Sequence, residues 1–455
     1  MCCVLSRRTC DRRWMGYIDM PTCFIETLGC KVNHFESESI LARFAELGWR
    51  RADPWGRTDL YIVNTCCVTQ KAAMQSRQAV RRAIRRHPSA FIIVTGCYAQ
   101  TAPKEIASIP GVHLILGNDF KENIPNLAPL EKPEHPPAIN VNDEPTSSFF
   151  GFQGDTLQTR TRPFIKIQDG CNTFCSYCIV PYARGRSRSL PPDRVLDKIE
   201  ALAKAGYQEV VICGIHIGRY GLDLKPKTSL LSLLEEIERA HPIKRVRLSS
   251  LEPTEITDEI IHLLARSRII CPHLHIPLQS GDDQVLKRMN RPYTALSYRD
   301  LIFRIVKNLP HVAIGADVMV GFPGESESAF ANTLNLVRGL PLSYLHVFPY
   351  SRRKGTRAYS FGEQVPPQII KRRSYAMRSL GREKRVAFYK KSIGTTTEVL
   401  IEEKRDSMTG HLTGLTGNYI PVLVDGKDNL MQKIVKVRLY KIAHGKVFGR
   451  PVIHN

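Results

Sequence analysis

Three cysteines near the middle of the chain have the spacing of a metal-binding loop. Cys171, Cys175 and Cys178 lie in the segment DGCNTFCSYCIVPYARG, with three and then two residues between them. Clustered thiolates hold iron–sulfur clusters, and a four-iron cluster normally takes four of them. Only three are supplied locally, so one iron would keep a position for a small ligand, much as a catalytic zinc ion does. We therefore predict a cluster here. The alternatives are a zinc site, which usually needs two paired motifs, and three unconnected thiols.

Three further cysteines are far apart in the sequence but equivalent in their setting. Cys30, Cys66 and Cys97 are separated by 36 and 31 residues, and each follows a predicted strand. The carboxyl ends of parallel strands meet at one edge of a sheet, where such sheets bind their ligands. These positions indicate a second three-thiolate cluster, and ordinary buried thiols of a core are the alternative.

The remaining cysteines have no comparable setting. The chain holds 13 cysteines, none beyond Cys271, and an odd number in a long chain without a secretory signal favours metal or redox chemistry over a disulfide scaffold. We interpret Cys2, Cys3, Cys10, Cys23, Cys213 and Cys271 as core packing or incidental exposure.

The elements that position these cysteines alternate between strands and helices. In residues 20–130, short apolar β-rich runs lie at 23–29, 59–65, 90–96 and 112–117, with helices expected at about 36–47 and 70–86. This alternation predicts an open parallel α/β domain with right-handed crossovers. The proline-rich segment 131–156 is expected to be an extended linker. Residues 1–19 would form a basic N-terminal arm, unless translation starts at Met15 or Met20.

The rest of the chain divides into two further regions. Residues 157–390 contain six predicted strand–helix units, too few for a complete eight-unit barrel, so we expect a partial, laterally open (βα)6 barrel. Its functional face should be the carboxyl ends of the strands. Residues 391–455 lose the helical period and break into about five short strands, which predicts a small all-β barrel or sandwich. The predicted fold class is therefore α/β with a C-terminal all-β domain.

The charge of the chain favours a polyanionic partner. The 455 residues carry a formal net charge of +22, which favours nucleic acid over an anionic membrane surface. Acid-poor basic segments lie at 71–87 and 371–391 and at Arg184, Arg186 and Arg188. In the first segment Met74, Val80 and Ile84 supply an apolar stripe, so the basic side chains should face outward.

The sequence carries no signal for a membrane or for secretion. No apolar run approaches the roughly 20 residues of a membrane helix, and the N-terminus lacks the apolar region of a secretory signal. We expect a cytoplasmic protein without a membrane partner. Selection of one base would require a single-stranded loop in which that base can be splayed out.

The CxxxCxxC loop after the first strand of the middle region resembles that of the radical S-adenosylmethionine (SAM) enzymes. The resemblance implies that the free iron chelates the methionine moiety of SAM, and that an electron from the cluster cleaves SAM to a 5′-deoxyadenosyl radical. It also implies SAM contacts from residues at the ends of the later strands. The candidates are Gly214, Ser249 with Ser250, Glu252, Gln279 with Ser280, and Asp317.

The whole arrangement from about Pro21 onward resembles the methylthiotransferases, and the last region resembles their RNA-binding TRAM barrel. The segments TLGCKVNHFESE, VTGCYAQ, CIVPYARG and LHVFPYSRRKGT are most similar to the bacterial branch that modifies threonylcarbamoyladenosine in tRNA. Other branches modify isopentenyladenosine in tRNA or an aspartate of a ribosomal protein. Two features depart from the pattern. The arm 1–19 lies outside it, and Cys67 stands where the family usually has another residue, so Cys66 is the predicted ligand.

The resemblance implies two [4Fe-4S] clusters and two uses of SAM. One SAM would methylate a sulfur on the cluster of Cys30, Cys66 and Cys97, and a second, on the other cluster, would generate the radical. The methylthio group would enter at C2 of the threonylcarbamoylated adenosine beside the anticodon. That C–H bond has no useful acidity, so radical chemistry suits it. The implied partners are a tRNA anticodon stem-loop, an electron donor such as a flavodoxin, and a sulfur source.

Two other functions remain open from the sequence. The first is methylthiolation of isopentenyladenosine in tRNA or of a ribosomal protein, although a chain of charge +22 would repel a basic ribosomal substrate. The second is a non-enzymatic, metal-containing RNA-binding protein, for which zinc without iron or sulfide would be the evidence.

Overall fold

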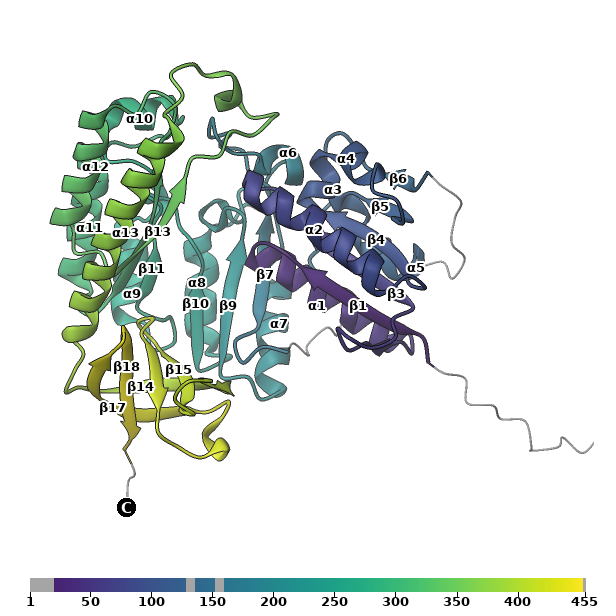
Figure 1. Cartoon of the computed structure of the whole chain (residues 1–455). Coiled ribbons are helices and arrows are strands. Elements are labelled where there is room, and N and C mark those ends of the chain that lie inside the picture. Colours follow the sequence, from purple (N-terminus) through teal and green to yellow (C-terminus); the bar gives the residue numbers. More distant parts are fainter. Residues whose placement is uncertain (1–19, 128–135, 152–158, 453–455) are drawn as a thin grey trace, which may run out of the picture.

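The computed structural model describes residues 20–127, 136–151 and 159–452, and the predicted arm 1–19 lies outside this part of the chain. It contains a parallel sheet with its helices, a curved set of six parallel strands, and a small closed barrel (Figure 1). The predicted fold class is confirmed. Among the described residues, no helix has both the length and the apolar character needed to cross a bilayer.

The N-terminal body is a six-stranded parallel sheet in the order β2–β1–β3–β4–β5–β6. The central strands β3 and β4 are buried along their whole length, because helices cover a parallel sheet on both faces. The strands are β1 (Thr22–Thr27), β2 (Arg50–Arg51), β3 (Leu60–Thr65), β4 (Phe91–Gly96), β5 (Leu114–Leu116) and β6 (Ala138–Asn140). The helices are α1 (Lys31–Glu46), α2 (Gln70–Arg86), α3 (Cys97–Thr101), α4 (Pro103–Ala107), the 3-10 turn η1 (Asn118–Asn123) and α5 (Ile124–Leu127).

Two features of this body differ from the sequence-based expectation. Helix α1 begins at Lys31, directly after Cys30, so Glu36 lies inside the helix and is buried rather than at its start. Strand β6 lies within the segment predicted to be a linker, where it pairs with β5, and Phe149 is buried in the core of the same body. This part of the segment therefore belongs to the sheet.

The central body carries six parallel strands in chain order, flanked by helices. A parallel bridge between Val246 and Ile270 joins the sheet β10–β9–β7–β8 to the sheet β11–β12–β13. No pairing among the described residues closes β13 onto β7, so the barrel is laterally open. The strands are β7 (Phe164–Asp169), β8 (Arg188–Ser189), β9 (Glu209–Gly214), β10 (Arg245–Leu248), β11 (His273–His275), β12 (Ala313–Val320) and β13 (Tyr344–Pro349). The helices are α6 (Val180–Arg184), α7 (Pro192–Lys204), α8 (Leu230–Ala240), α9 (Asp258–Arg266), α10 (Asp283–Arg288), α11 (Ala295–Asn308), α12 (Glu327–Gly339) and α13 (Pro367–Lys390), with 3-10 turns η2 (Ile217–Arg219), η3 (Pro253–Glu255) and η4 (Arg357–Ser360).

The two faces of these strands differ in chemistry, because successive side chains of a strand point to opposite sides. One set is apolar, packs with the surrounding helices in a single core, and includes Ile314 and Leu345. The alternating set faces the inside of the barrel and is largely polar. It includes Lys166 and Gln168 on β7, Glu209 and Cys213 on β9, Arg245 and Arg247 on β10, His273 and His275 on β11, Asp317 on β12, and Tyr344 and His346 on β13.

The C-terminal body is a closed five-stranded barrel in the order β14–β15–β16–β18–β17, as predicted. It lies beneath the central body in Figure 1, where Arg247 donates to the carbonyl oxygens of Gly417 at 2.9 Å and Thr416 at 3.0 Å. Its strands are β14 (Thr396–Arg405), β15 (Leu412–Thr416), β16 (Pro421–Val424), β17 (Ile434–Ala443) and β18 (Lys446–Pro451), with a 3-10 turn η5 (Asp428–Leu430).

Candidate active site

The cysteine loop 171–178 leaves the carboxyl end of β7 and packs closely against the following turn. Gly170 has φ +70°, and a Cβ atom there would lie 1.9 Å from the carbonyl oxygen of Arg186. The amide of Cys171 donates to the carbonyl of Gly185 at 3.0 Å. A residue with a side chain at position 170 would therefore displace the loop.

Side chains from two distant segments hold the thiols of this loop. Nδ1 of His216, just after β9, lies 3.4 Å from Sγ of Cys171, and its Nε2 lies 2.7 Å from Oε1 of Glu255. Arg291 donates from Nη1 to Sγ of Cys175 at 3.2 Å. Burial raises the pKa of Cys171, but the contact with His216 outweighs it, so that this pKa lies below its ordinary value. Burial raises the pKa of Cys175 above its ordinary value and that of Cys178 to about 12, so Cys171 is the thiol of this loop whose surroundings favour the thiolate, the form that binds metal.

Cys30, Cys66 and Cys97 are brought to one edge of the N-terminal sheet. They follow the adjacent strands β1, β3 and β4, and the residues just before Cys66 and Cys97 are direct partners in the β3–β4 ladder. Burial, with the neighbouring charges of Cys97 and Cys30, raises the pKa of Cys66 to about 12. Cys30 is exposed, whereas the other two thiols are buried. Three thiols that act on one another at a sheet edge are a donor set that suits an iron–sulfur cluster.

Cys67 has different surroundings from its neighbour. Its Sγ lies 3.4 Å from the carbonyl oxygen of Cys97 and packs in the apolar core with Ala73 and Val80. Cys66, in contrast, packs against Gly29, where a Cβ atom would lie 2.9 Å from its Sγ.

A group of five buried charges lies between the two cysteine sets. Lys166 of β7 contacts Glu36 of α1 at 2.8 Å and Asp169 at 2.8 Å. Arg184 of α6 contacts the same two carboxylates at 2.9 and 3.0 Å, and Lys121 also pairs with Glu36. All five side chains are at most 6% exposed. This group, which we call the buried charge cluster, joins the N-terminal body to the barrel.

The prediction that Arg184 belongs to a basic cluster for a polyanionic partner is therefore wrong. Its side chain is buried and ion-paired. Arg188 is half-buried and donates to Oγ of Ser148 at 2.6 Å. Only Arg186 of these three is exposed.

Most of the predicted SAM contacts lie at or after the carboxyl ends of their strands, and one lies inside a strand. Gly214 ends β9, Ser249 follows β10, and Gln279, with φ +62°, lies just after β11. Glu252 pairs with Arg291, the residue that contacts Cys175.

Asp317 differs from the others. It lies inside β12, which continues to Val320, so the prediction that it stands at the carboxyl end of its strand is wrong. It binds His275 of β11 and His346 of β13 instead.

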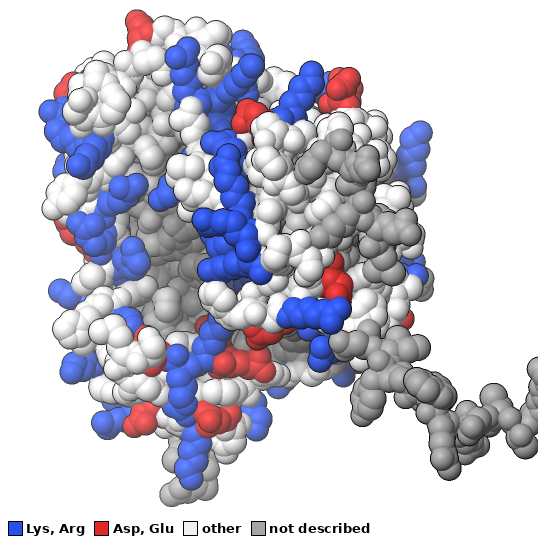
Figure 2. All heavy atoms as spheres, turned by 45° about the vertical axis from the view of Figure 1, so that its right-hand side comes forward, with Lys and Arg blue, Asp and Glu red and all other residues white. Residues whose placement is uncertain are grey.

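Basic side chains gather on one face of the molecule, where Figure 2 shows a band of Lys and Arg beside a hollow. A cleft of about 1190 Å³ between α2, α3 and the loop before η4 includes Lys71, Arg77, Arg352, Arg353 and Lys354 in its lining. Such a surface suits the phosphates of a nucleic acid.

Helix α2 presents its basic residues to solvent, but its buried stripe differs from the prediction. The buried residues are Ala73, Ser76, Ala79, Val80 and Ala83. Met74, which was predicted to lie in the stripe, is 43% exposed.

Comparisons with known proteins agree with this architecture. Family models match residues 22–117 (uncharacterized protein family UPF0004), 165–337 (radical SAM superfamily) and 390–452 (TRAM domain). The solved structure of the radical SAM methyltransferase TsrM from Kitasatospora setae has a TM-score of 0.55 at 16% identity, covering 74% of this chain and 77% of that one, which supports the fold alone.

Curated relatives cover nearly the whole chain. The threonylcarbamoyladenosine tRNA methylthiotransferase MtaB of Bacillus subtilis is 41% identical over 93% of this chain and 95% of its own length. MtaB of Aquifex aeolicus is 36% identical over 90% and 98%. The tRNA-2-methylthio-N(6)-dimethylallyladenosine synthase of Clostridium tetani is 34% identical over 95% and 96%.

The chain therefore belongs to the radical SAM methylthiotransferase family. It is an enzyme of the transferase class, which confirms the expected family and overturns the alternative of a non-enzymatic binding protein. As a radical SAM enzyme it uses SAM and a [4Fe-4S] cluster.

Proposed function

We propose that this enzyme adds a methylthio group to C2 of N6-threonylcarbamoyladenosine next to the anticodon of tRNA. The MtaB relatives, which are 36–41% identical over at least nine-tenths of this chain, support this substrate. The basic cleft and the C-terminal barrel support a tRNA partner, because both are typical of proteins that bind an RNA backbone.

The observation that carries the two-cluster chemistry is the position of Cys30, Cys66 and Cys97 at one sheet edge. We assign these three to one [4Fe-4S] cluster and Cys171, Cys175 and Cys178 to another. When bound, the second cluster supplies the electron that cleaves SAM to a radical. We assign Gly214, Ser249, Glu252 and Gln279 to the SAM pocket beside it.

The protein's own residues orient and enclose these groups. His216 and Arg291 hold the thiols of Cys171 and Cys175. Helix α1 packs against β7 and β9, and the charges of Lys31 and Cys30 at its start act on the pKa of Cys213 in β9, which burial raises to about 12. The first cysteine of the N-terminal set thus lies within electrostatic reach of the inner face of β9.

Cysteine variants test whether the two cysteine sets bind two clusters with different roles. Cys175→Ala should abolish both reductive SAM cleavage and tRNA modification, because it removes a ligand of the SAM-binding cluster. Cys66→Ala should leave reductive SAM cleavage in place, abolish thiolation and lower the iron content from about eight to about four atoms per chain. Cys67→Ala is the matched control, since its thiol lies in the apolar core. Thiolation by the Cys66 variant would contradict the two-cluster assignment.

The substrate is tested by nucleoside mass spectrometry of tRNA. The host should lack its own threonylcarbamoyladenosine methylthiotransferase and carry this gene or an empty vector. We expect the methylthio form of threonylcarbamoyladenosine only with the gene. Methylthiolation of dimethylallyladenosine instead would assign the chain to the reaction named for the Clostridium tetani relative.

A further inference from the structure

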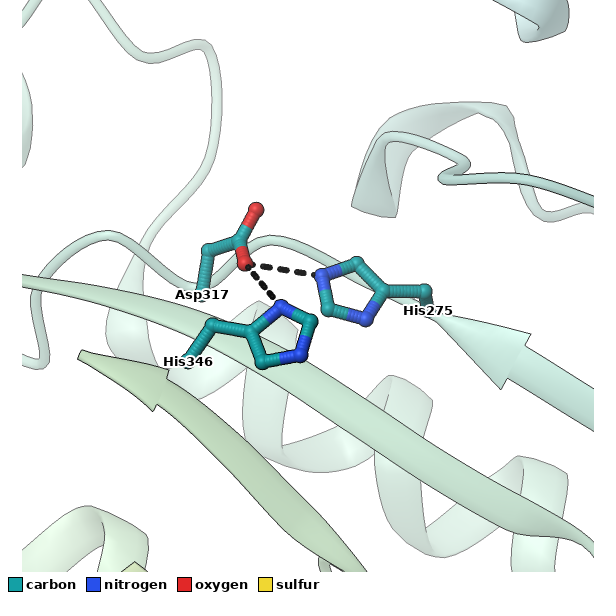
Figure 3. A group of neighbouring side chains, drawn as sticks. All are labelled: His275, Asp317 and His346. Atoms are coloured by element: carbon teal, nitrogen blue, oxygen red, sulfur yellow. Dashed lines mark hydrogen bonds and ion pairs between the residues drawn. The ribbon is translucent and has the colours of Figure 1, made fainter. Parts of the chain in front are cut away.

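The inner wall of the barrel holds a polar group that neither cysteine set uses. His275, Asp317 and His346 lie on the neighbouring strands β11, β12 and β13 (Figure 3). Their side chains point away from the apolar core, which contains the alternating residues of the same strands, so they face the inside of the barrel. Of the three, His275 is buried, Asp317 is partly buried and His346 is exposed.

Asp317 is the centre of this group. Its Oδ1 accepts from Nε2 of His275 at 2.8 Å and lies 3.4 Å from Nδ1 of His346. Burial disfavours its charge, but the two imidazoles outweigh burial and hold the pKa of Asp317 well below its ordinary value. The carboxylate is therefore ionised and oriented before any substrate arrives.

His275 is fixed from behind and acts as the support of the group. Its Nδ1 lies 3.1 Å from the hydroxyl of Tyr344, which also contacts Nε2 of His273 at 2.9 Å. His275 and Tyr344 thus hold the carboxylate in one orientation.

The other side of the group is open. The side chain of His346 is 53% exposed, and Phe348, two residues along the same face of β13, is 43% exposed. Among the described residues, neither Oδ2 of Asp317 nor Nε2 of His346 has a hydrogen-bond partner. The inner wall therefore offers a free acceptor, a free imidazole nitrogen and an aromatic surface side by side.

The N-terminal body contributes a lysine that acts electrostatically on the same wall of the barrel. Burial lowers the pKa of His273, and the charges of Arg247, His275 and Lys31 lower it further, so Lys31 lies within electrostatic reach of β11. Lys31 directly follows Cys30, so this charge and the thiol lie side by side in the sequence at the start of α1.

These groups complement the substituent that distinguishes the proposed substrate from plain adenosine. A threonylcarbamoyl group carries urea N–H donors, a carboxylate and a hydroxyl. An ionised carboxylate suits the N–H donors, because charge-assisted hydrogen bonds are the stronger ones. With Nδ1–H of His346 directed at Asp317, its Nε2 donates to the carboxylate of the substituent when the ring carries both protons. An isopentenyl group offers none of these partners.

We propose that Asp317 and His346, supported by His275, bind the threonylcarbamoyl substituent of the substrate adenosine. This assignment rests on the proposed function and replaces the predicted role of Asp317 as a SAM contact. A divalent metal site is the competing interpretation, because the three ligand atoms lie within 4.8 Å of one another. In Figure 3 one nitrogen of each imidazole points at Oδ1 of Asp317. The ligands of a metal ion would instead point at a common position between them, so these hydrogen bonds favour substrate binding.

The test measures how full-length, cluster-loaded enzyme binds three anticodon stem-loops. One carries threonylcarbamoyladenosine, one its methyl ester, which lacks the carboxylate charge, and one plain adenosine.

We expect wild type to prefer the first stem-loop over the second by about tenfold or more, as for a hydrogen bond to a charged group. His346→Gln should reduce this preference to less than about twofold. The substitution in the enzyme and the methyl ester in the RNA together form a double-mutant cycle. Asp317→Asn should reduce the preference for the modified loops over plain adenosine. His262→Gln, on the exposed side of α9, is the matched control.

The outcomes distinguish an error in the proposed substrate from an error in the residues assigned to bind it. An undiminished preference in both His346→Gln and Asp317→Asn overturns this assignment but leaves the proposed function standing. A wild-type enzyme without any preference for the threonylcarbamoyl loop contradicts the proposed function itself. About one equivalent of a metal other than cluster iron, lost in His346→Gln, would instead establish the metal site and overturn substrate binding.

Discussion

At the scale of single residues, the buried charge cluster connects side chains of the N-terminal body with side chains of the barrel. It has three cations, Lys121, Lys166 and Arg184, and two anions, Glu36 and Asp169. Removing ions from water costs several kcal/mol each, so each anion here needs its contacts with more than one cation. The charge of Arg184 also acts on Cys30 and Cys66. The cluster therefore both joins two bodies and provides a positive environment for the N-terminal thiols.

Loss of Arg184 should destabilise the protein strongly. Arg184→Met leaves Glu36 and Asp169 buried with too few partners, and removing one member of a buried ion pair lowers the free energy of unfolding by about 3–5 kcal/mol. The measurement is the urea midpoint of the purified chain. Arg186→Met, two residues away and exposed, should stay within about 0.5 kcal/mol of wild type. Equal midpoints for the two variants would show that the buried charges do not stabilise the fold.

The sequence predicts the cysteines of both sets but not the side chains around them. The six cysteines are visible because local spacing and strand ends mark them. His216 and Arg291 are not, because they contact Cys171 and Cys175 from 45 and 116 residues away, and no local pattern identifies such partners. Arg184 illustrates the opposite error, since a basic run gives no sign of which member is buried.

At the scale of elements, α2 is the basic helix best placed for contact with a polyanion. Its buried side consists mainly of small residues that allow close packing on the sheet, and Lys71, Arg81, Arg85 and Arg86 are exposed. Arg77 and Arg82 are partly neutralised, because they pair with Glu105 and Glu26. We therefore expect four of the six basic residues of α2 to remain available for phosphates.

Charge reversal on α2 should weaken tRNA binding in a salt-dependent way. Arg81→Glu with Arg85→Glu removes two cations, and each lost phosphate contact lowers the slope of log K against log salt by about 0.7–0.9. Affinity at fixed salt should fall with little change in the choice of base. Lys307→Glu, on the exposed surface of α11, is the matched control. An unchanged salt slope in the double variant would place the tRNA on another surface.

The bounds of helices and strands are predicted best where hydrophobic periodicity is strong. They are predicted worst where acidic residues or prolines are typical of a different structure. The bounds of α2 agree with the expectation, because a Thr69 cap and a regular pattern mark its start. The first turn of α1 was missed, since an acidic residue such as Glu36 is typical of a helix start. Strand β6 was missed because it lies in a proline-rich segment, and prolines are tolerated beside an edge strand.

At the scale of the whole molecule, the C-terminal barrel is docked onto the inner wall of the central body. Tyr419 stacks on His273 at 4.2 Å, and Arg247 donates to the turn before it. His273 in turn contacts Tyr344, the residue behind His275. The barrel therefore touches the same layer of residues that supports the proposed substrate contacts.

Removal of this docking contact should weaken the binding of tRNA and leave the reductive cleavage of SAM unchanged. Tyr419→Ala loses the stack on His273, so the barrel is held less firmly, and we expect KM for tRNA to rise about tenfold, as for the loss of a pre-organised binding module. Reductive SAM cleavage without tRNA should be unchanged. Tyr440→Ala, half exposed on β17, is the matched control. A wild-type KM in the Tyr419 variant would show that the docking contact does not position the barrel for tRNA.

Helix α1 has a consequence for how such proteins can be recombined. Cys30 directly precedes this helix, and Glu36 within it is neutralised by Lys121 of the same body and by Lys166 and Arg184 of the barrel. A chimera that takes its first 127 residues from this chain and its barrel from a distant relative would bury Glu36 without Lys166 and Arg184. Exchange of this module between homologues is therefore restricted to barrels that bring matching cations, and the two halves are expected to be inherited together.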